Sequence, residues 1–223
     1  MKSLDLIEMG VKVFTHYFPF LFALSFHEYA HGWMAKRKGD NTAEVMGRLT
    51  LNPTAHIDPI GTVALPLAAI FFGIPFFGWA KPVPVNPNNL QNKKVDMFWI
   101  ALAGPLSNVL LAVVGAFVTV LLFRLGYITP GSISSAKLLQ ALQIFVLINL
   151  FLFMFNMLPL HPLDGGKILE RYLPYNANKW LEDNQGMLQM VLIGVFIMGG
   201  FKYLAGPAFF IMENLFGIFE ALL

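Results

Sequence analysis

Long apolar runs separated by short polar stretches dominate the pattern of this chain. Residues 11–35, 97–123 and 136–158 are each rich in Phe, Leu, Ile, Val and Ala. A helix of ~20 residues crosses a hydrocarbon core of ~30 Å, and each run is long enough to do so. The turn-forming stretch ITPGSISS separates the second run from the third. The pattern therefore predicts at least three transmembrane helices.

Two further apolar stretches are interrupted. The tail 187–222 is interrupted by GG at 199–200, by Lys202 and by GP at 206–207. It could therefore form either one long span or two shorter ones. Residues 60–78 are just long enough to cross a bilayer, but they include Pro66, Gly73, Pro75 and Gly78. Irregular backbone at membrane depth is tolerated only where protein encloses it or where it lines a wet cavity. This second stretch is ambiguous from its pattern alone.

The composition agrees with an all-α polytopic membrane protein. Of 223 residues, 57% are hydrophobic and only 13% are charged, whereas ordinary soluble domains hold ~25% charged residues. The net charge of +2 gives no indication of a nucleic-acid partner, and the absence of cysteine excludes disulfides and thiolate metal sites. The length suits a single domain, 1–223. We expect no cleavable signal peptide, because the first apolar run carries His27, Glu28 and His31 and lacks a small-residue cleavage pattern.

The most informative motif is HEYAH, residues 27–31, inside the first predicted span. His27 and His31 are four residues apart, so on a helix they project from one face and can bind one metal ion together. Glu28 can then act as general base toward a water at that metal. The motif also occurs by chance in soluble helices. Ionisable groups inside a membrane are costly, however, and this location favours a functional site.

A zinc site needs a third protein ligand, and the best candidate is Asp164 in NMLPLHPLDGGKIL, residues 156–169. Two prolines end the third predicted span there, and the glycine pair after Asp164 allows a sharp turn. Alternatively, Asp164 only caps the helix that follows. His161 is a competing ligand, which we place instead near the metal or the substrate. The prediction is one zinc ion per chain.

These residues resemble the site-2 protease family of intramembrane zinc metalloproteases, peptidase family M50. The resemblance rests on HEYAH followed by FNMLPLHPLDGG. The chain also resembles a short subgroup of this family in the stretches GRLTLNPTAHIDPIGT, GWAKPVPVN and ALAGPLSN. It implies that His27, His31 and Asp164 bind zinc, that Glu28 is the catalytic base, and that Asn156 lies near the substrate. No PDZ or CBS accessory domain is recognisable.

The proposed ligands constrain the topology. His27 and His31 lie toward the C-terminal end of the first span, and Asp164 follows the C-terminal end of the third. Both ends must therefore reach one side, so residues 60–78 should be re-entrant or interfacial. That side would hold ten cations, against four on the other: Lys36, Arg37, Lys38, Arg48, Lys81, Lys93, Lys94, Lys167, Arg171 and Lys179, against Lys2, Lys12, Arg124 and Lys137. The positive-inside rule then places the active site toward the cytoplasm, in the cell (inner) membrane.

The predicted function is zinc-dependent hydrolysis of peptide bonds in transmembrane protein or peptide substrates within the lipid bilayer. The short β-like stretches 47–51 and 81–85 could hold an unwound substrate as an added strand, or they could be ordinary loops. A zinc transporter and a catalytically silent binding protein of the same fold are the alternatives. The intact Glu28 argues against both.

Two further polar residues each allow two roles. Asn108 lies in the middle of the second span and could contact substrate or the zinc ligands, or could form a small-residue packing surface with its neighbours. His56 lies in a predicted loop and could support the site or the loop itself. The sequence leaves the oligomeric state open.

Overall fold

The computed structural model describes residues 3–73, 76–129, 131–200 and 202–223. All regular elements within these residues are helical. The α-helices are α1 Ser3–Lys12, α2 Phe18–Arg37, α3 Thr42–Val45, α4 Leu65–Phe72, α5 Lys93–Arg124, α6 Ile133–Asn156, α7 Asp164–Glu170, α8 Tyr175–Asp183, α9 Gln185–Val195 and α10 Lys202–Leu222. Short π-helical turns at Val13–Tyr17 and Pro59–Ala64 continue directly into α2 and α4.

Among the described residues, four helical stretches are long and apolar enough to cross a membrane: Glu8–Arg37, Lys93–Arg124, Ile133–Asn156 and Lys202–Leu222. The first three coincide with the three predicted spans. In the tail, Gly199 has φ +83° and interrupts the helix between α9 and α10. Of the tail helices that the structure describes, α10 reaches spanning length and α9 is a shorter apolar helix.

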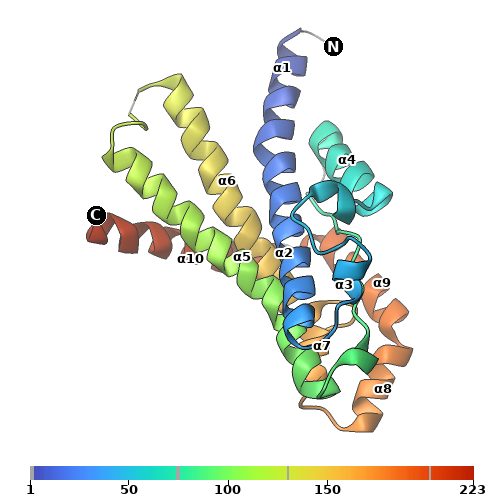
Figure 1. The fold of residues 1–223 in the computed structure, drawn as a ribbon. Helices are drawn as coiled ribbons and strands as arrows, with labels where there is room; N and C mark the ends of the chain where they lie inside the picture. Colours follow the sequence, from blue (N-terminus) through green and yellow to red (C-terminus); the bar gives the residue numbers. More distant parts are fainter. Residues whose placement is uncertain (1–2, 74–75, 130, 201) are drawn as a thin grey trace.

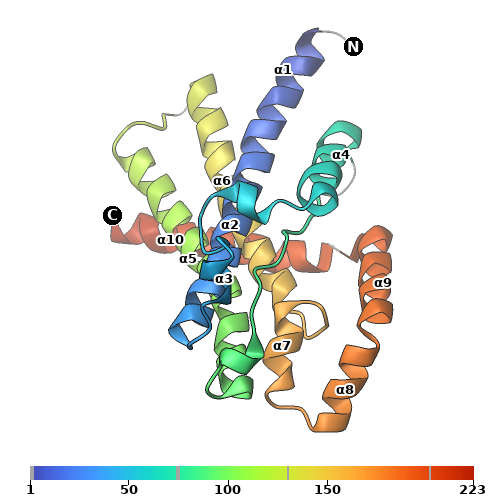
Figure 2. The ribbon, with the colours of Figure 1, turned by 45° about the vertical axis from the view of Figure 1, so that its right-hand side comes forward.

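The centre of the molecule is formed by α2, α5 and α6, with α5 running antiparallel to the other two (Figure 1). Small residues of α5, Ala112 and Ala116, pack against Val146 and Leu150 of α6. Helix α10 crosses this pair and adds Ala208 to the same buried cluster (Figures 1 and 2). As a consequence of this antiparallel order, the C-terminal ends of α2 and α6 and the N-terminal end of α5 lie together.

The ambiguous stretch 60–78 forms a hairpin. The helix that runs from Pro59 to Phe72 ends at Gly73, whose left-handed conformation (φ +68°) stops it. From residue 76 to residue 86 the described backbone forms neither helix nor strand. The two ends of the hairpin meet, because the N–H of Trp79 donates to the carbonyl of Gly61 at 3.1 Å and Thr62 Oγ1 donates to the Trp79 carbonyl at 2.8 Å. The hairpin therefore begins and ends on one side of the molecule.

The extended residues 79–86, called the strap below, cross the C-terminal half of α2. We expected β-like segments at 47–51 and 81–85, but no strand is found among the described residues. Pro82 and Pro84 have no N–H to place in a ladder. The N–H of Lys81 donates to the carbonyl of His56 and that of Val83 to a side chain, so the strap forms isolated hydrogen bonds instead of strand pairs.

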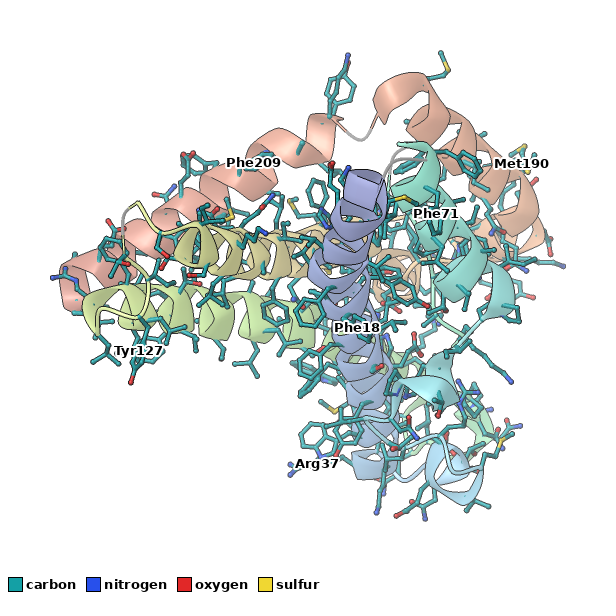
Figure 3. All side chains as sticks on the ribbon, turned by 90° about the horizontal axis from the view of Figure 1, so that it is seen from above. Phe18, Arg37, Phe71, Tyr127, Met190 and Phe209 are labelled. Carbon is teal, nitrogen blue, oxygen red and sulfur yellow. The ribbon has the colours of Figure 1, made fainter. Side chains whose placement is uncertain are left out.

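Large apolar side chains cover the outside of the helices. Phe18, Phe71 and Phe209 are all about half exposed, and they project outward from three different elements (Figure 3). Exposed apolar area on this scale is what a lipid-facing surface requires. Together with the four apolar helices, it indicates a multi-pass membrane protein.

Candidate metal centre and active site

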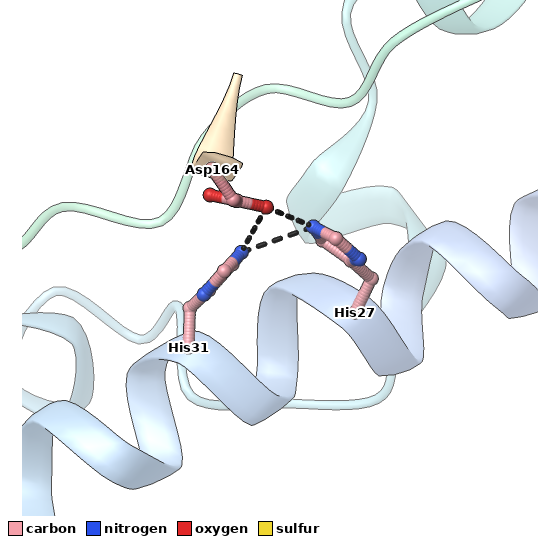
Figure 4. Close-up of side chains that lie close together, drawn as sticks. All are labelled: His27, His31 and Asp164. Atoms are coloured by element: carbon pink, nitrogen blue, oxygen red, sulfur yellow. Dashed lines mark hydrogen bonds and ion pairs between the residues drawn. The ribbon is translucent and has the colours of Figure 1, made fainter. Parts of the chain in front are cut away.

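Two histidines and one aspartate meet where α2 passes the start of α7. His27 and His31 project from one face of α2, as the i, i+4 spacing requires, and Asp164 is the first residue of α7 (Figure 4). All three side chains are buried. Asp164 Oδ2 lies 3.0 Å from His27 Nε2 and 3.3 Å from His31 Nε2, and the two Nε2 atoms are 3.0 Å apart.

The hydrogen bonds of the far ring atoms fix the chemistry of this cluster. His31 Nδ1 lies 2.6 Å from the carbonyl oxygen of Ile100, and His27 Nδ1 lies 2.7 Å from Asn108 Oδ1. Both partners are acceptors, so each Nδ1 carries the hydrogen and each Nε2 of a neutral ring presents a lone pair. Two lone pairs and a carboxylate oxygen then converge. The cluster needs positive charge at its centre, and a metal ion would supply it.

The donor set fits zinc. Two imidazole nitrogens and one carboxylate oxygen are the ligands of many catalytic zinc sites, which leave a fourth position open. Ligands at about 2.0–2.1 Å from a tetrahedral ion lie roughly 3.3 Å from each other. The observed separations of 3.0, 3.0 and 3.3 Å are close to that value. Among the described residues, these three form the group of possible metal ligands.

One face of α5 supports both imidazoles. Ile100, Gly104 and Asn108 follow each other at intervals of four residues, so they line one stripe of that helix. A Cβ at Gly104 would overlap His31 Nε2 and lie 2.7 Å from His27 Nε2, so only glycine fits beneath the rings. The Asn108 amide nitrogen donates to Asn149 Oδ1 of α6 at 3.0 Å and to the Ala23 carbonyl at 3.3 Å. Asn108 and Asn149 are both fully buried.

The loop before α7 presents Asp164. Gly165 and Gly166 pack so tightly against the backbone of residues 157–161 that a Cβ on either would overlap it, and α7 can therefore begin directly beneath the loop. The Asp164 carboxylate oxygen Oδ2 faces both Nε2 atoms and could serve as the anionic ligand of the group.

Glu28 faces a different side of α2, toward the strap. Its Oε2 accepts a hydrogen bond from the N–H of Val83 at 2.7 Å, and the side chain is only 8% exposed. Glu28 lines the same cavity of about 500 Å³ as His27, His31 and Asp164. The cavity walls come from α2, the strap, α5, α6, α7 and α9, and they are mostly apolar.

The remaining predicted site residues differ in location. Asn156, at the end of α6, lines the cavity and donates to the Leu152 carbonyl at 3.0 Å. Asn108 lies beneath His27.

His161 is buried outside the described cavity wall, and its Nε2 lies 3.2 Å from Glu170 Oε1. Burial lowers the pKa of His161 and raises the pKa of Glu170. His56 is also outside it, bonded through Nε2 to the Thr50 carbonyl at 2.8 Å.

Sequence reasoning missed several groups that surround the cluster. Asn149 could have been found as a polar residue in the middle of an apolar span. The sequence placed Gly104 only in the possible packing surface with Asn108, because a glycine in a transmembrane helix is common. The carbonyl of Ile100 and the N–H of Val83 are backbone groups, which the residue types do not reveal.

The comparisons with known proteins agree on one family. The model of peptidase family M50 matches residues 16–129 and 124–199. YwhC of Bacillus subtilis (strain 168), named as a zinc metalloprotease, is 36% identical over 181 residues, which are 80% of this chain and 79% of YwhC. Rip2 of Mycolicibacterium smegmatis, with the same kind of name, is 32% identical over 69% of this chain and 55% of Rip2. No solved structure matches the chain.

Proposed function

The chain belongs to peptidase family M50 and is an intramembrane zinc metalloprotease, and from this premise we propose that it cleaves peptide bonds within or near the transmembrane segments of other membrane proteins. In this proposal His27, His31 and Asp164 bind one zinc ion and Glu28 is the general base. Residues 1–223 act as a single catalytic domain.

The observation that carries this proposal is the meeting of three metal-ligand atoms and a buried carboxylate in one cavity. The ligands come from α2 and α7, which are far apart in the sequence. Structural zinc sites are usually closed by four protein ligands, whereas catalytic sites keep a position open. Three ligands beside a cavity that also contains Glu28 favour catalysis.

Each residue has a distinct part in the reaction. When bound, zinc would polarise the scissile carbonyl and lower the pKa of a water molecule. Glu28 accepts the proton of the attacking water and passes it to the leaving amine. Because the Val83 N–H already occupies Oε2, the other carboxylate oxygen is the one that takes the proton. Asn156 has a second amide hydrogen that can donate to a substrate carbonyl.

The cavity indicates how a substrate would bind. Its apolar wall suits the side chains of a transmembrane segment, but the carbonyls of a helix are bonded internally, so the segment must unwind before cleavage. The strap can hold only part of such a segment by strand addition. The N–H groups of Trp79, Lys81 and Val83 all have partners already, and the two strap prolines have none to offer. The strap therefore offers few N–H groups to a substrate.

The orientation follows from charge. The ten cations named for the ligand side belong to segments around the end of α2, the start of α5 and the end of α6, and the positive-inside rule assigns that side to the cytoplasm. The active site would then face the cytoplasmic side of the cell membrane, with residues 60–78 as a re-entrant hairpin and the N-terminus outside.

The test is cleavage of single-span membrane proteins by purified protein in liposomes. Glu28→Gln should retain zinc but lose at least about 100-fold in rate, because an amide cannot accept the proton. Glu213→Gln, a matched change at an exposed position of α10, should cleave normally. Cleavage by Glu28→Gln at the wild-type rate would contradict the role of Glu28. Zinc flux into the liposomes that does not depend on Glu28 would favour a transporter.

A further inference from the structure

One peptide group of the strap lies between a cation and Glu28. The N–H of Val83 donates to Glu28 Oε2 at 2.7 Å. The carbonyl of Pro82, which belongs to the same peptide group, accepts from Arg48 Nη2 at 3.1 Å. The same nitrogen of Arg48 also donates to the Lys81 carbonyl at 2.8 Å. A guanidinium and a carboxylate are thus connected through a single peptide plane.

The strap is held firmly at this position. Pro82 and Pro84 restrict the backbone on both sides of Val83, and the Lys81 N–H donates to the His56 carbonyl at 2.9 Å. Gly32, one turn after Glu28 on the same face of α2, allows the close approach. A Cβ there would lie only 3.1 Å from Val83 Cγ1. The direction of the Val83 N–H is therefore fixed by the surrounding structure.

This arrangement acts on Glu28 in two ways. A glutamate has three rotatable side-chain bonds, and a fixed donor selects the rotamer in which Oε2 meets the strap. Hydrogen bonds to charged groups are stronger than neutral ones, and a cation at the carbonyl end polarises the peptide and strengthens its N–H as a donor. Arg48 thereby strengthens a contact to Glu28 although it does not touch it.

We propose that Arg48, acting through the Pro82–Val83 peptide group, positions the Glu28 carboxylate for proton transfer. Arg48 and Val83 are positioning residues, not catalytic ones, since neither needs to contact the substrate. The inference rests on the proposed function only for the role of Glu28 as base. The hydrogen-bonded connection itself can be tested separately.

The kinetic test compares variants that remove one part of the connection each. Val83→Pro removes the N–H and keeps an extended backbone, whereas Val83→Ala keeps the N–H and removes the side chain. Arg48→Met removes the cation from an unbranched side chain. For Val83→Pro and Arg48→Met we expect kcat to fall about 10- to 100-fold, as for other groups that orient an active residue. KM and zinc content should stay unchanged, and Val83→Ala, which keeps the N–H on Glu28, should lose less kcat than Val83→Pro.

A double variant separates positioning from folding. If both residues act through one hydrogen bond, Val83→Pro with Arg48→Met should lose no more kcat than Val83→Pro alone, because the effects of coupled residues are not additive. Losses that multiply, or a loss that appears in KM or in zinc content, would overturn the proposal.

Amide hydrogen exchange tests the connection without using activity. Residues 81–86 carry amides only at Lys81, Val83, Val85 and Asn86, so Val83 can be resolved by fragmentation. In Glu28→Ala we expect the Val83 amide to exchange at least about 10-fold faster while the Lys81 amide is unchanged, since only Val83 loses its acceptor. Unchanged Val83 exchange would overturn the proposal. A normal exchange response in a protein that cleaves nothing would contradict the proposed function instead.

Discussion

At the scale of single residues, a missing methyl group makes room for the metal centre. Gly104 lies on the face of α5 beneath His27 and His31, and any Cβ there would overlap the ring of His31. The imidazoles cannot move away easily, because their Nδ1 atoms are bonded to the Ile100 carbonyl and to Asn108. The requirement for glycine here is therefore one of space, and it does not depend on backbone conformation.

We predict that Gly104→Ala lowers zinc affinity at least about 10-fold, because displaced rings cannot present both Nε2 atoms to one ion. Competition with a fluorescent chelator measures the affinity. Gly217→Ala makes the same change in α10, where a Cβ would meet nothing within 4 Å. Equal zinc affinity in the two variants would contradict the close approach of α5.

Asn108 is expected to orient His27. Asn108→Leu leaves the buried His27 Nδ1–H without an acceptor, and we predict a loss of zinc affinity of about 10- to 100-fold. Asn149→Leu should cost less, since the Asn108 amide keeps its second acceptor, the Ala23 carbonyl. Asn214→Leu, at an exposed position of α10, is the control. The same chelator competition measures the zinc affinity of each variant. A larger loss of zinc affinity in Asn149→Leu than in Asn108→Leu would contradict this prediction.

At the scale of elements, the strap depends on Asp40, which follows the end of α2. The fully buried carboxylate of Asp40 accepts from the N–H of Asn86 at 2.7 Å, from the Asn89 amide at 2.8 Å, and from the N–H and hydroxyl of Thr42. Burial would raise the pKa of Asp40, but these donors together hold it below its ordinary value of 3.8. The carboxylate thereby ties the far end of the strap to the loop after α2.

We predict that Asp40→Asn destabilises the protein by about 2 kcal/mol, because an amide offers one acceptor oxygen where the carboxylate offers two. Because the folded pKa is depressed, this stabilisation is fully present above pH 3.8 and is lost as the pH falls through the lower folded value. Thermal unfolding in detergent at neutral pH measures the loss. Asp183→Asn, at an exposed position, should leave the unfolding temperature unchanged.

At the scale of the whole molecule, the topology follows from where the ligands meet. Helix α5 runs antiparallel to α2 and α6, so His27, His31 and Asp164 reach the same end (Figure 1). The hairpin 60–78 also begins and ends on one side, because Trp79 bonds back to Gly61. Both observations agree with a chain in which the segment between α2 and α5 does not cross the bilayer.

We predict that single cysteines at Asn41 and Asn92 react with a membrane-impermeant maleimide only from the cytoplasmic side, and one at Ser132 only from outside. The protein has no native cysteine, so the background is low. A cysteine at Phe72, in the hairpin, should react weakly or only from the cytoplasm. Reaction of Asn41 and Asn92 from opposite faces would mean that the hairpin crosses the membrane.

The sequence by itself predicted the long apolar helices and the residue types that could bind a metal ion. Three spans were predictable because a bilayer of fixed thickness requires a run of apolar residues of known length. The i, i+4 histidines predicted a shared ligand face because helix geometry is local. The order of these motifs along the chain then led to the prediction that residues 60–78 do not cross the bilayer. These features depend on periodicity and length, which a sequence states directly.

Only the tertiary structure decided how the site is supported. Gly104, Asn149 and the peptide group between Pro82 and Val83 act because segments distant in sequence approach within hydrogen-bond distance. Local propensity predicted strand pairing for the β-like stretch 81–85. In the structure this stretch instead forms single hydrogen bonds to the His56 carbonyl, to Arg48 and to Glu28. Propensity and spacing cannot specify such partners, because the packing of helices sets them.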